Sequence, residues 1–142
     1  MRLILDTAAM VAAIRSDAGA SRRLLLAALQ RRFTLLASVP LVIEYQAVMT
    51  RPEHLKVSGL SADDVNVLLD AVVAVIEPVR LAFLWRPFAR DQDDDMVLEA
   101  AINGQADAIV TFNIRDFAQA AVHFGIEVLS PGEAWQRVEK GK

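Results

Sequence analysis

The sequence predicts an α/β fold in which helices cover a mainly parallel β-sheet. Short apolar runs alternate with longer helical patterns along the whole chain, and this alternation is typical of parallel strands joined by helices. The 142 residues match the size of one domain, and no internal repeat or linker divides residues 1–142. Apolar residues make up 54% and charged residues 23% of the chain, a composition that excludes intrinsic disorder.

In the first half of the chain, two short apolar runs predict buried strands, and helical patterns follow each of them. The strands are expected at Arg2–Leu5 and Thr34–Ala37, the helices at Thr7–Ile14, Ser21–Arg31, Pro40–Met49 and Ser61–Ala74, and extended chain at Ile76–Val79. Pro40 suits a first helical turn, where its missing N–H needs no partner. Ser61 and Asp64 form a capping pattern before apolar residues with helical spacing. Segments 51–60 and 86–93 are expected to be loops.

The second half of the chain continues the alternation of helices and strands. Helices are expected at Asp94–Asn103, in part of Arg115–Phe124 and after Ser130, and strands at Asp107–Thr111 and Ile126–Leu129. Gly104 is a typical residue to end the first of these helices. Ser130, followed by Pro and, three residues later, Glu133, predicts the start of a terminal helix.

Composition also limits the classes of function. The chain has no cysteine, which excludes disulfides, thiol nucleophiles and cysteine-ligated metals. The net charge of −3 argues against nucleic-acid binding unless several acids belong to one metal site. No apolar run is long enough to span a membrane, and Asp6 interrupts the only stretch that resembles a signal peptide. We therefore expect a cytoplasmic protein without a membrane partner.

Two isolated carboxylates lie in apolar surroundings. Asp6 ends the first predicted strand, where a buried charge needs a partner, a hydrogen bond or a metal ion. An equally good interpretation is that Asp6 caps the following helix. Glu44 shares one helical face with Leu41, Tyr45 and Val48. The Glu44 carboxylate either reaches water or an arginine, or it belongs to a functional site. We favour the functional site because nothing around Glu44 is polar.

Further polar residues follow the later strand and begin the helix before it. The stretch 91–95 carries four Asp residues, which the helix dipole would favour without any function. Asp95 and Glu99 are like charges one turn apart, a weak indication of a bound cation. Thr111, Asn113 and Asp116 come just after the strand at 108–110 and could form either a turn or part of a site.

The unusual charges are therefore carboxylates at strand ends or in an apolar helix. Carboxylate oxygens without Cys or His favour hard cations, Mg²⁺ or Mn²⁺. His54 and His123 are isolated, and no glycine-rich phosphate loop is present. Several carboxylates around one or two such ions are typical of phosphodiester hydrolysis.

The sequence resembles the PIN domain family, the nuclease fold of VapC-type toxins, over nearly its whole length. The most specific motif is VTFNIRDF at Val110–Phe117, and LILDT at Leu3–Thr7 and SPGEAW at Ser130–Trp135 lie near the two ends. The segments ASVPLVIEYQAVMTRPEHL and RDQDDDMVLEAA resemble a branch described as toxin components of toxin–antitoxin systems.

The resemblance implies a three-layer α/β/α sandwich and a Mg²⁺- or Mn²⁺-dependent ribonuclease site with one or two ions. The four acids that would bind metal are Asp6, Glu44, Asp95 and Asp116. Thr111 and Asn113 match polar residues that hold the site or its water, and Arg115 lies beside it. Asp94 competes with Asp95 for the third position, although a slip of one residue rotates a helical side chain by about 100°.

The resemblance also implies partners: an RNA substrate, an antitoxin protein and a second copy in a homodimer. Arg22, Arg23, Arg31 and Arg32 are candidates for contacts with the RNA backbone, although a solvated helix end is the simpler interpretation. The sequence departs from the family at Ala8, where many relatives have Asn or Ser, and at Gln92, where this branch often has Pro. Neither departure removes a ligand.

Four other classes of protein share part of this pattern. A haloacid-dehalogenase-like phosphatase needs a second Asp where Ala8 stands, and a response-regulator receiver needs a lysine after its last strand, which this chain lacks. A catalytically degenerate interaction module would keep the fold without binding metal. A PIN nuclease that is not a toxin, acting in RNA processing or on DNA, would share the same site.

Overall fold

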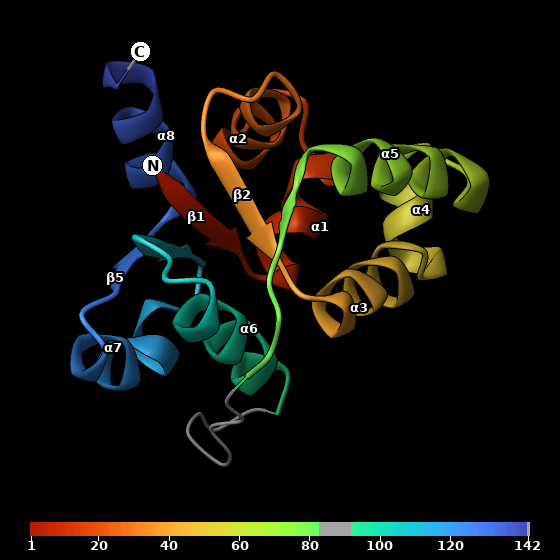
Figure 1. Ribbon diagram of the computed structural model, residues 1–142. Helices are drawn as coiled ribbons and strands as arrows, with labels where there is room; N and C mark the ends of the chain where they lie inside the picture. Colours follow the sequence, from red (N-terminus) through yellow and green to blue (C-terminus); the bar gives the residue numbers. More distant parts are fainter. Residues whose placement is uncertain (83–91, 142) are drawn as a thin grey trace.

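A five-stranded parallel sheet forms the centre of the computed structural model, which describes residues 1–82 and 92–141 (Figure 1). The strands are β1 (Arg2–Leu5), β2 (Thr34–Ala37), β3 (Glu77–Pro78), β4 (Ala108–Val110) and β5 (Glu127–Leu129). Their order is β3-β2-β1-β4-β5, and every neighbouring pair is parallel. The predicted parallel sheet is therefore confirmed.

Helices cover both faces of this sheet. They are α1 (Thr7–Arg15), α2 (Ala20–Leu29), α3 (Val39–Met49), α4 (Pro52–Ser58), α5 (Ala62–Val75), α6 (Gln92–Asn103), α7 (Ile114–His123) and α8 (Pro131–Lys140). Helix α2 packs between α1 and α8 on one side, while α6 packs on β1, β2 and β4 beside α7 on the other (Figure 1). This arrangement confirms the three-layer α/β/α sandwich. None of the helices in the described residues has the length and apolar character needed to cross a membrane.

The predicted elements agree with the observed ones within one or two residues, with one exception. The segment expected to be a loop at 51–60 contains helix α4. Its sequence carries ordinary helix signals that the loop prediction overlooked: Pro52 in the first turn, and Gly59 at the C-cap with a φ of 75°. The other predicted loop, 86–93, lies mostly outside the described residues, and its last two positions already belong to α6.

The central strand is apolar on both sides because both of its sides are covered. Leu3, Ile4 and Leu5 are all fully buried, and a continuous apolar run is the expected pattern for a parallel strand between two helical layers. Each such side chain contributes about 1.5–3 kcal/mol through its removal from water. Burial on both sides also leaves only the strand ends for polar residues.

The strand order changes direction at β1. The chain runs outward through β2 to β3, returns through α6, and continues with β4 and β5 on the other side of β1. The carboxyl ends of β1 and β4 are therefore adjacent, and the backbone N–H of Asp6 donates to the carbonyl of Val110 at 3.0 Å. In parallel sheets such a reversal leaves a crevice above the strand ends, where binding sites are typically found.

The opposite end of the sheet is held by ion pairs and hydrogen bonds. The Arg2 guanidinium contacts Glu77 at 2.5 Å and donates to the Gly104 carbonyl at 2.8 Å. The Arg2 N–H donates to Asp107 at 2.7 Å. These contacts connect β1 to β3 and to the turn before β4.

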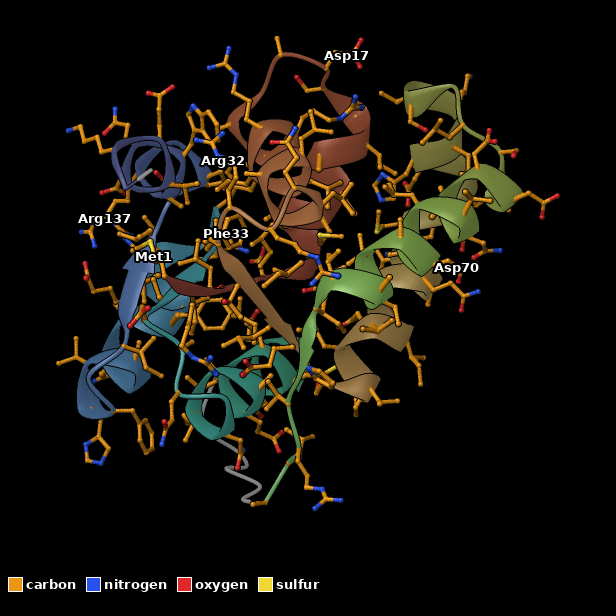
Figure 2. The ribbon with its side chains drawn as sticks, turned by 45° about the horizontal axis from the view of Figure 1, so that its top comes forward. Met1, Asp17, Arg32, Phe33, Asp70 and Arg137 are labelled. Carbon is orange, nitrogen blue, oxygen red and sulfur yellow. The ribbon has the colours of Figure 1, made fainter. Side chains whose placement is uncertain are left out.

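Three of the four arginines considered for RNA contacts have partners within the protein. The Arg22 guanidinium donates to the carbonyl oxygens of Ala13 and Ile14, and Arg31 donates to the carbonyl of Ala74 at 3.4 Å. Arg32, labelled in Figure 2, lies 5.5 Å from the ring centre of Trp135 on α8. These contacts favour a structural role for the three residues; Arg23 is exposed.

We expect Gly104→Ala to destabilise the protein by about 1–3 kcal/mol, the usual cost of overpacking. A Cβ there would lie 2.7 Å from Val79 Cγ2 and 2.9 Å from the Ala100 carbonyl oxygen. Gly132→Ala is the matched control, because its Cβ would meet only Ser130 Oγ at 3.9 Å. Urea unfolding of both variants tests this; equal stabilities would contradict the tight packing around Gly104.

Candidate active site

Asp6 is the central residue of the candidate site. It follows β1 and is the N-cap of α1, with one carboxylate oxygen accepting from the Ala9 N–H at 2.8 Å. The other oxygen accepts from the Thr111 hydroxyl at 2.5 Å. The side chain is only 4% exposed. The capping interpretation is thus confirmed, and it does not exclude a second role, because a carboxylate has about four acceptor positions.

Thr111 connects Asp6 to the loop after β4. Its side chain is fully buried, and its backbone N–H donates to the carbonyl of Leu129 at 2.9 Å. Its hydroxyl accepts from the Asn113 N–H at 2.9 Å and donates to Asp6. Because both capacities of the hydroxyl are used, Thr111 fixes the orientation of the Asp6 carboxylate relative to the loop.

The Asp6 carboxylate is held in a position that disfavours its charge. Burial raises the pKa of Asp6 above its ordinary value, and the hydrogen bonds from Thr111 and Ala9 oppose that rise. A carboxylate in this condition gains from any cation that comes near it. The structure therefore presents Asp6 as a favourable partner for a positive charge.

Tyr45, which the sequence analysis did not include in the site, lies beside these acids. It is fully buried on α3, and its hydroxyl donates to the carbonyl oxygen of Leu5, the residue before Asp6. Burial raises the pKa of Tyr45 well above its ordinary range, and the negative charges of Asp6 and Glu44 raise it further. The phenol therefore stays protonated between the two acids. The only sequence signal for it was its place next to Glu44 on the apolar stripe.

Glu44 is half-buried on α3, and its Oε2 atom is buried. The helix is fixed at its start by Ser38, whose hydroxyl accepts from the Leu41 N–H at 3.3 Å. Leu41 and Tyr45 on the same face are fully buried. Glu44 is therefore at the edge of the core, next in sequence to Tyr45.

The two candidates for the third acid differ in burial. Asp95 on α6 is 4% exposed, whereas Asp94 is half-buried. Glu99, one turn further along, is completely buried. Helix α6 packs against β1 and α3, the elements that carry or precede the other acids. Burial favours Asp95 over Asp94 as the candidate for the third acid. It also draws attention to Glu99, which stood out in the sequence only by its spacing from Asp95.

The remaining predicted residues are less enclosed. Asp116 is half-buried in the first turn of α7, with its N–H donating to the Asn113 carbonyl at 3.1 Å. The side chains of Asn113 and Arg115 are exposed. Asn113 thus contributes its backbone N–H to the site, while Arg115 lies at the surface just before Asp116.

The donors fit a hard cation by their chemistry, although they do not form a finished cage. The described residues contain no group of three Asp, Glu or His side chains close enough together to hold an ion. Carboxylates repel one another when no cation lies between them. Beside Asp6, the Thr7 hydroxyl is buried and has no hydrogen-bond partner among the described residues. Oxygen donors alone, including this hydroxyl, are the set that Mg²⁺ and Mn²⁺ prefer.

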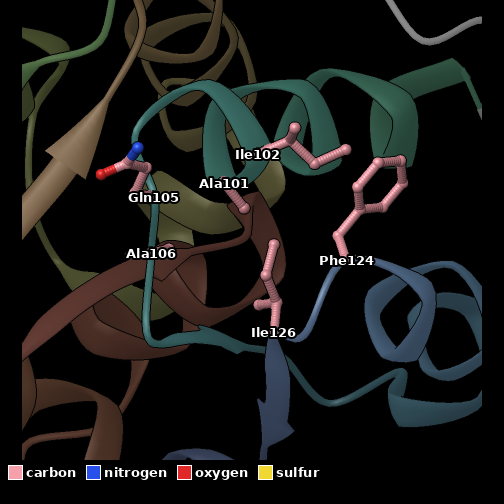
Figure 3. A pocket seen from close by; sticks show the side chains of 6 residues that line it. All are labelled: Ala101, Ile102, Gln105, Ala106, Phe124 and Ile126. Carbon is pink, nitrogen blue, oxygen red and sulfur yellow. The ribbon is translucent and has the colours of Figure 1, made fainter.

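A pocket at the amino end of the sheet does not suit the same chemistry. It has a volume of about 280 Å³ and lies between the end of α6 and the residues before β5 (Figure 3). Ile102, Phe124 and Ile126 make most of its wall, and Gln105 is its one polar side chain. It therefore offers neither a charge nor a metal ligand.

Comparison with known proteins shows the family and the fold of the chain. Residues 2–115 match the family model described as PIN domain. A chain in the crystal structure of VapBC2 from Rickettsia felis, bound to a DNA fragment from their promoter, has a TM-score of 0.60 and 17% sequence identity. The alignment covers 92% of this chain and 98% of that chain, and at this identity it shows a shared fold. No curated protein matches the sequence.

We expect Asp6→Asn to stabilise the metal-free protein at pH 7. Because the pKa of Asp6 is raised in the folded state, the wild type loses stability as the pH rises from the ordinary Asp range through that raised value. Asn keeps the helix cap with its oxygen and has no charge to bury, and its amide group can donate to the Thr111 hydroxyl, which has a second acceptor position. Urea unfolding in EDTA should show the gain at pH 7 and a smaller gain at about pH 4. A less stable variant at pH 7 would contradict the burial cost.

Proposed function

The chain belongs to the PIN domain family, a family of nucleases, and from this premise we propose that it is a metal-dependent endoribonuclease. We further propose that it is the toxin of a type II toxin–antitoxin pair and acts in the cytoplasm. The observation that carries the proposal is the buried Asp6 carboxylate, fixed by Thr111 where the strand order reverses. A buried acid with a raised pKa at such a crevice is typical of a functional site.

Asp6, Asp95 and Asp116, helped by Glu44, would hold one or two Mg²⁺ or Mn²⁺ ions. When bound, such an ion activates water and stabilises the leaving oxygen of a phosphodiester. Thr111 keeps Asp6 oriented, and the protonated Tyr45 holds the carbonyl of Leu5 behind it. The exposed Arg115 can contact a phosphate of the RNA. Hydrolysis in this way leaves 5′-phosphate and 3′-hydroxyl ends.

Protein partners are part of the proposal. The similar Rickettsia felis structure is a VapBC2 assembly on promoter DNA, which supports an antitoxin as a partner of this chain. Exposed apolar residues on α3 and α5, among them Val39, Ile43 and Val67 at 60–70% exposure, offer a surface for a protein contact. We propose that the protein forms a homodimer in addition to binding its antitoxin.

Cleavage of a labelled single-stranded RNA by the purified protein tests the function. We expect cleavage with Mg²⁺ or Mn²⁺ and none with EDTA. Asp6→Asn should lower the cleavage rate by more than roughly 10- to 100-fold, the loss that is typical when a partner of a metal ligand is removed. Asp70→Asn, which changes an exposed Asp on α5 (Figure 2), should keep the wild-type rate. Absence of cleavage together with no metal-dependent rise in melting temperature would favour the degenerate interaction module.

Asp95→Asn and Asp94→Asn distinguish the two candidates for the third acid. Asp95 is the more buried, so we expect its variant to lose most of the activity and of the Mn²⁺-dependent rise in melting temperature. Asp94→Asn should change the cleavage rate by less than about tenfold. Residues that contact a metal ligand typically cost roughly 10- to 100-fold when they are changed, and we expect Asp94 to have no such role. The reverse order of effects would assign the role to Asp94.

A further inference from the structure

A second pocket, with a volume of about 270 Å³, has in its wall Phe112, the residue that follows Thr111 of the candidate site. Ala12 on α1 and Ser16 just after it line one side, and Gly19–Ser21 at the start of α2 line the next. The first turn of α8 and the ring of Phe112 complete the wall. None of the residues that line this pocket carries a charge, so it presents no carboxylate to an anionic ligand.

Phe112 is an aromatic side chain in an unusual place. It is 57% exposed, and it lies between Thr111, which holds Asp6, and Asn113, which donates to Thr111. A large apolar ring left open to solvent gains from any flat partner that covers it. Its neighbour in the chain, Thr111, connects it to Asp6.

The start of α2 offers polar groups on the opposite side of this pocket. Gly19 is the N-cap and provides no side-chain hydrogen bond, so the first N–H groups of the helix are not capped by it. The Ser21 side chain is 3% exposed, and its hydroxyl has no hydrogen-bond partner among the described residues. Uncapped N–H groups with the positive end of the helix dipole favour a negative ligand group.

Small residues connect this pocket to Asp6. Ala8 and Ala12 are four residues apart on α1 and share one face of the helix, and Ser16, the C-cap residue that follows α1, comes four residues later. Ala8 and Ser16 are exposed and Ala12 is half-buried. The three positions span about 12 Å along the helix. A flexible chain bound at the acids can follow this face without meeting a bulky side chain.

We propose that the pocket is a subsite for one nucleotide of a single-stranded RNA substrate, with the base stacked on Phe112 and the phosphate near the start of α2. This subsite rests on the proposed nuclease function. It would hold a nucleotide near the phosphodiester bond that is cleaved. Stacking on an aromatic ring accepts any base, so the subsite binds single strands without specifying a sequence. A base held in a duplex would not be free to enter it.

Fluorescence anisotropy of a fluorescein-labelled ten-nucleotide oligouridylate tests the subsite. The Asp6→Asn protein serves as the parent, because it should bind the RNA without cutting it. Adding Phe112→Ala should weaken binding by about tenfold, within the range measured for the loss of one stacked base. Phe112→Trp should keep the affinity of the parent, since it keeps an aromatic face. Val122→Ala, which changes a 77% exposed residue of α7 outside the pocket, is the control.

The outcomes separate the subsite from the function on which it rests. Equal affinities of the parent and its Phe112→Ala variant, with RNA bound by both, would overturn the subsite and leave the nuclease proposal standing. Equal losses in Phe112→Ala and Val122→Ala would overturn it as well. If the wild type neither binds nor cleaves RNA, the proposed function fails, and the subsite fails with it.

Discussion

The structure depends on the way that one buried carboxylate is held. Asp6 accepts hydrogen bonds from the Ala9 N–H and from the Thr111 hydroxyl. The first bond starts helix α1, and the second joins the ends of β1 and β4, where the strand order reverses. Burial makes this charge expensive, as the raised pKa shows. Asn or Ser could cap α1 without a charge to bury, so helix capping alone does not account for an Asp at this position.

The two ends of the sheet differ in how their charged residues are held. At the amino end, Arg2 pairs with Glu77 and Gly104, so charges there are neutralised within the protein. At the carboxyl end, the buried Asp6 accepts from the Thr111 hydroxyl. The first arrangement holds the strands together. The second holds a buried acid whose pKa is raised by its burial, a combination that is typical of functional sites.

Much of the fold could be predicted from local patterns. The apolar run at β1, the capping boxes at Ser61 and Ser130 and the short strands between helices indicated the right elements, because each depends on neighbours in sequence. Helix α4 was missed although Pro52 and Gly59 marked its ends. The acids Asp6 and Glu44 could be singled out because a lone charge in an apolar stretch stands out against its surroundings.

What the sequence by itself determined is thus the fold class, the elements and a set of unusual acids. Only the tertiary structure decided which contacts surround them: the Thr111 hydroxyl on Asp6, the Tyr45 hydroxyl on the carbonyl of Leu5, and the deeper burial of Asp95 than of Asp94. Asp6 and Thr111 are 105 residues apart in the chain and meet only because their strands are neighbours. The pocket at Phe112 likewise combines three helices and a loop. The physical reason is that hydrogen bonds and burial between distant segments leave no local pattern in sequence.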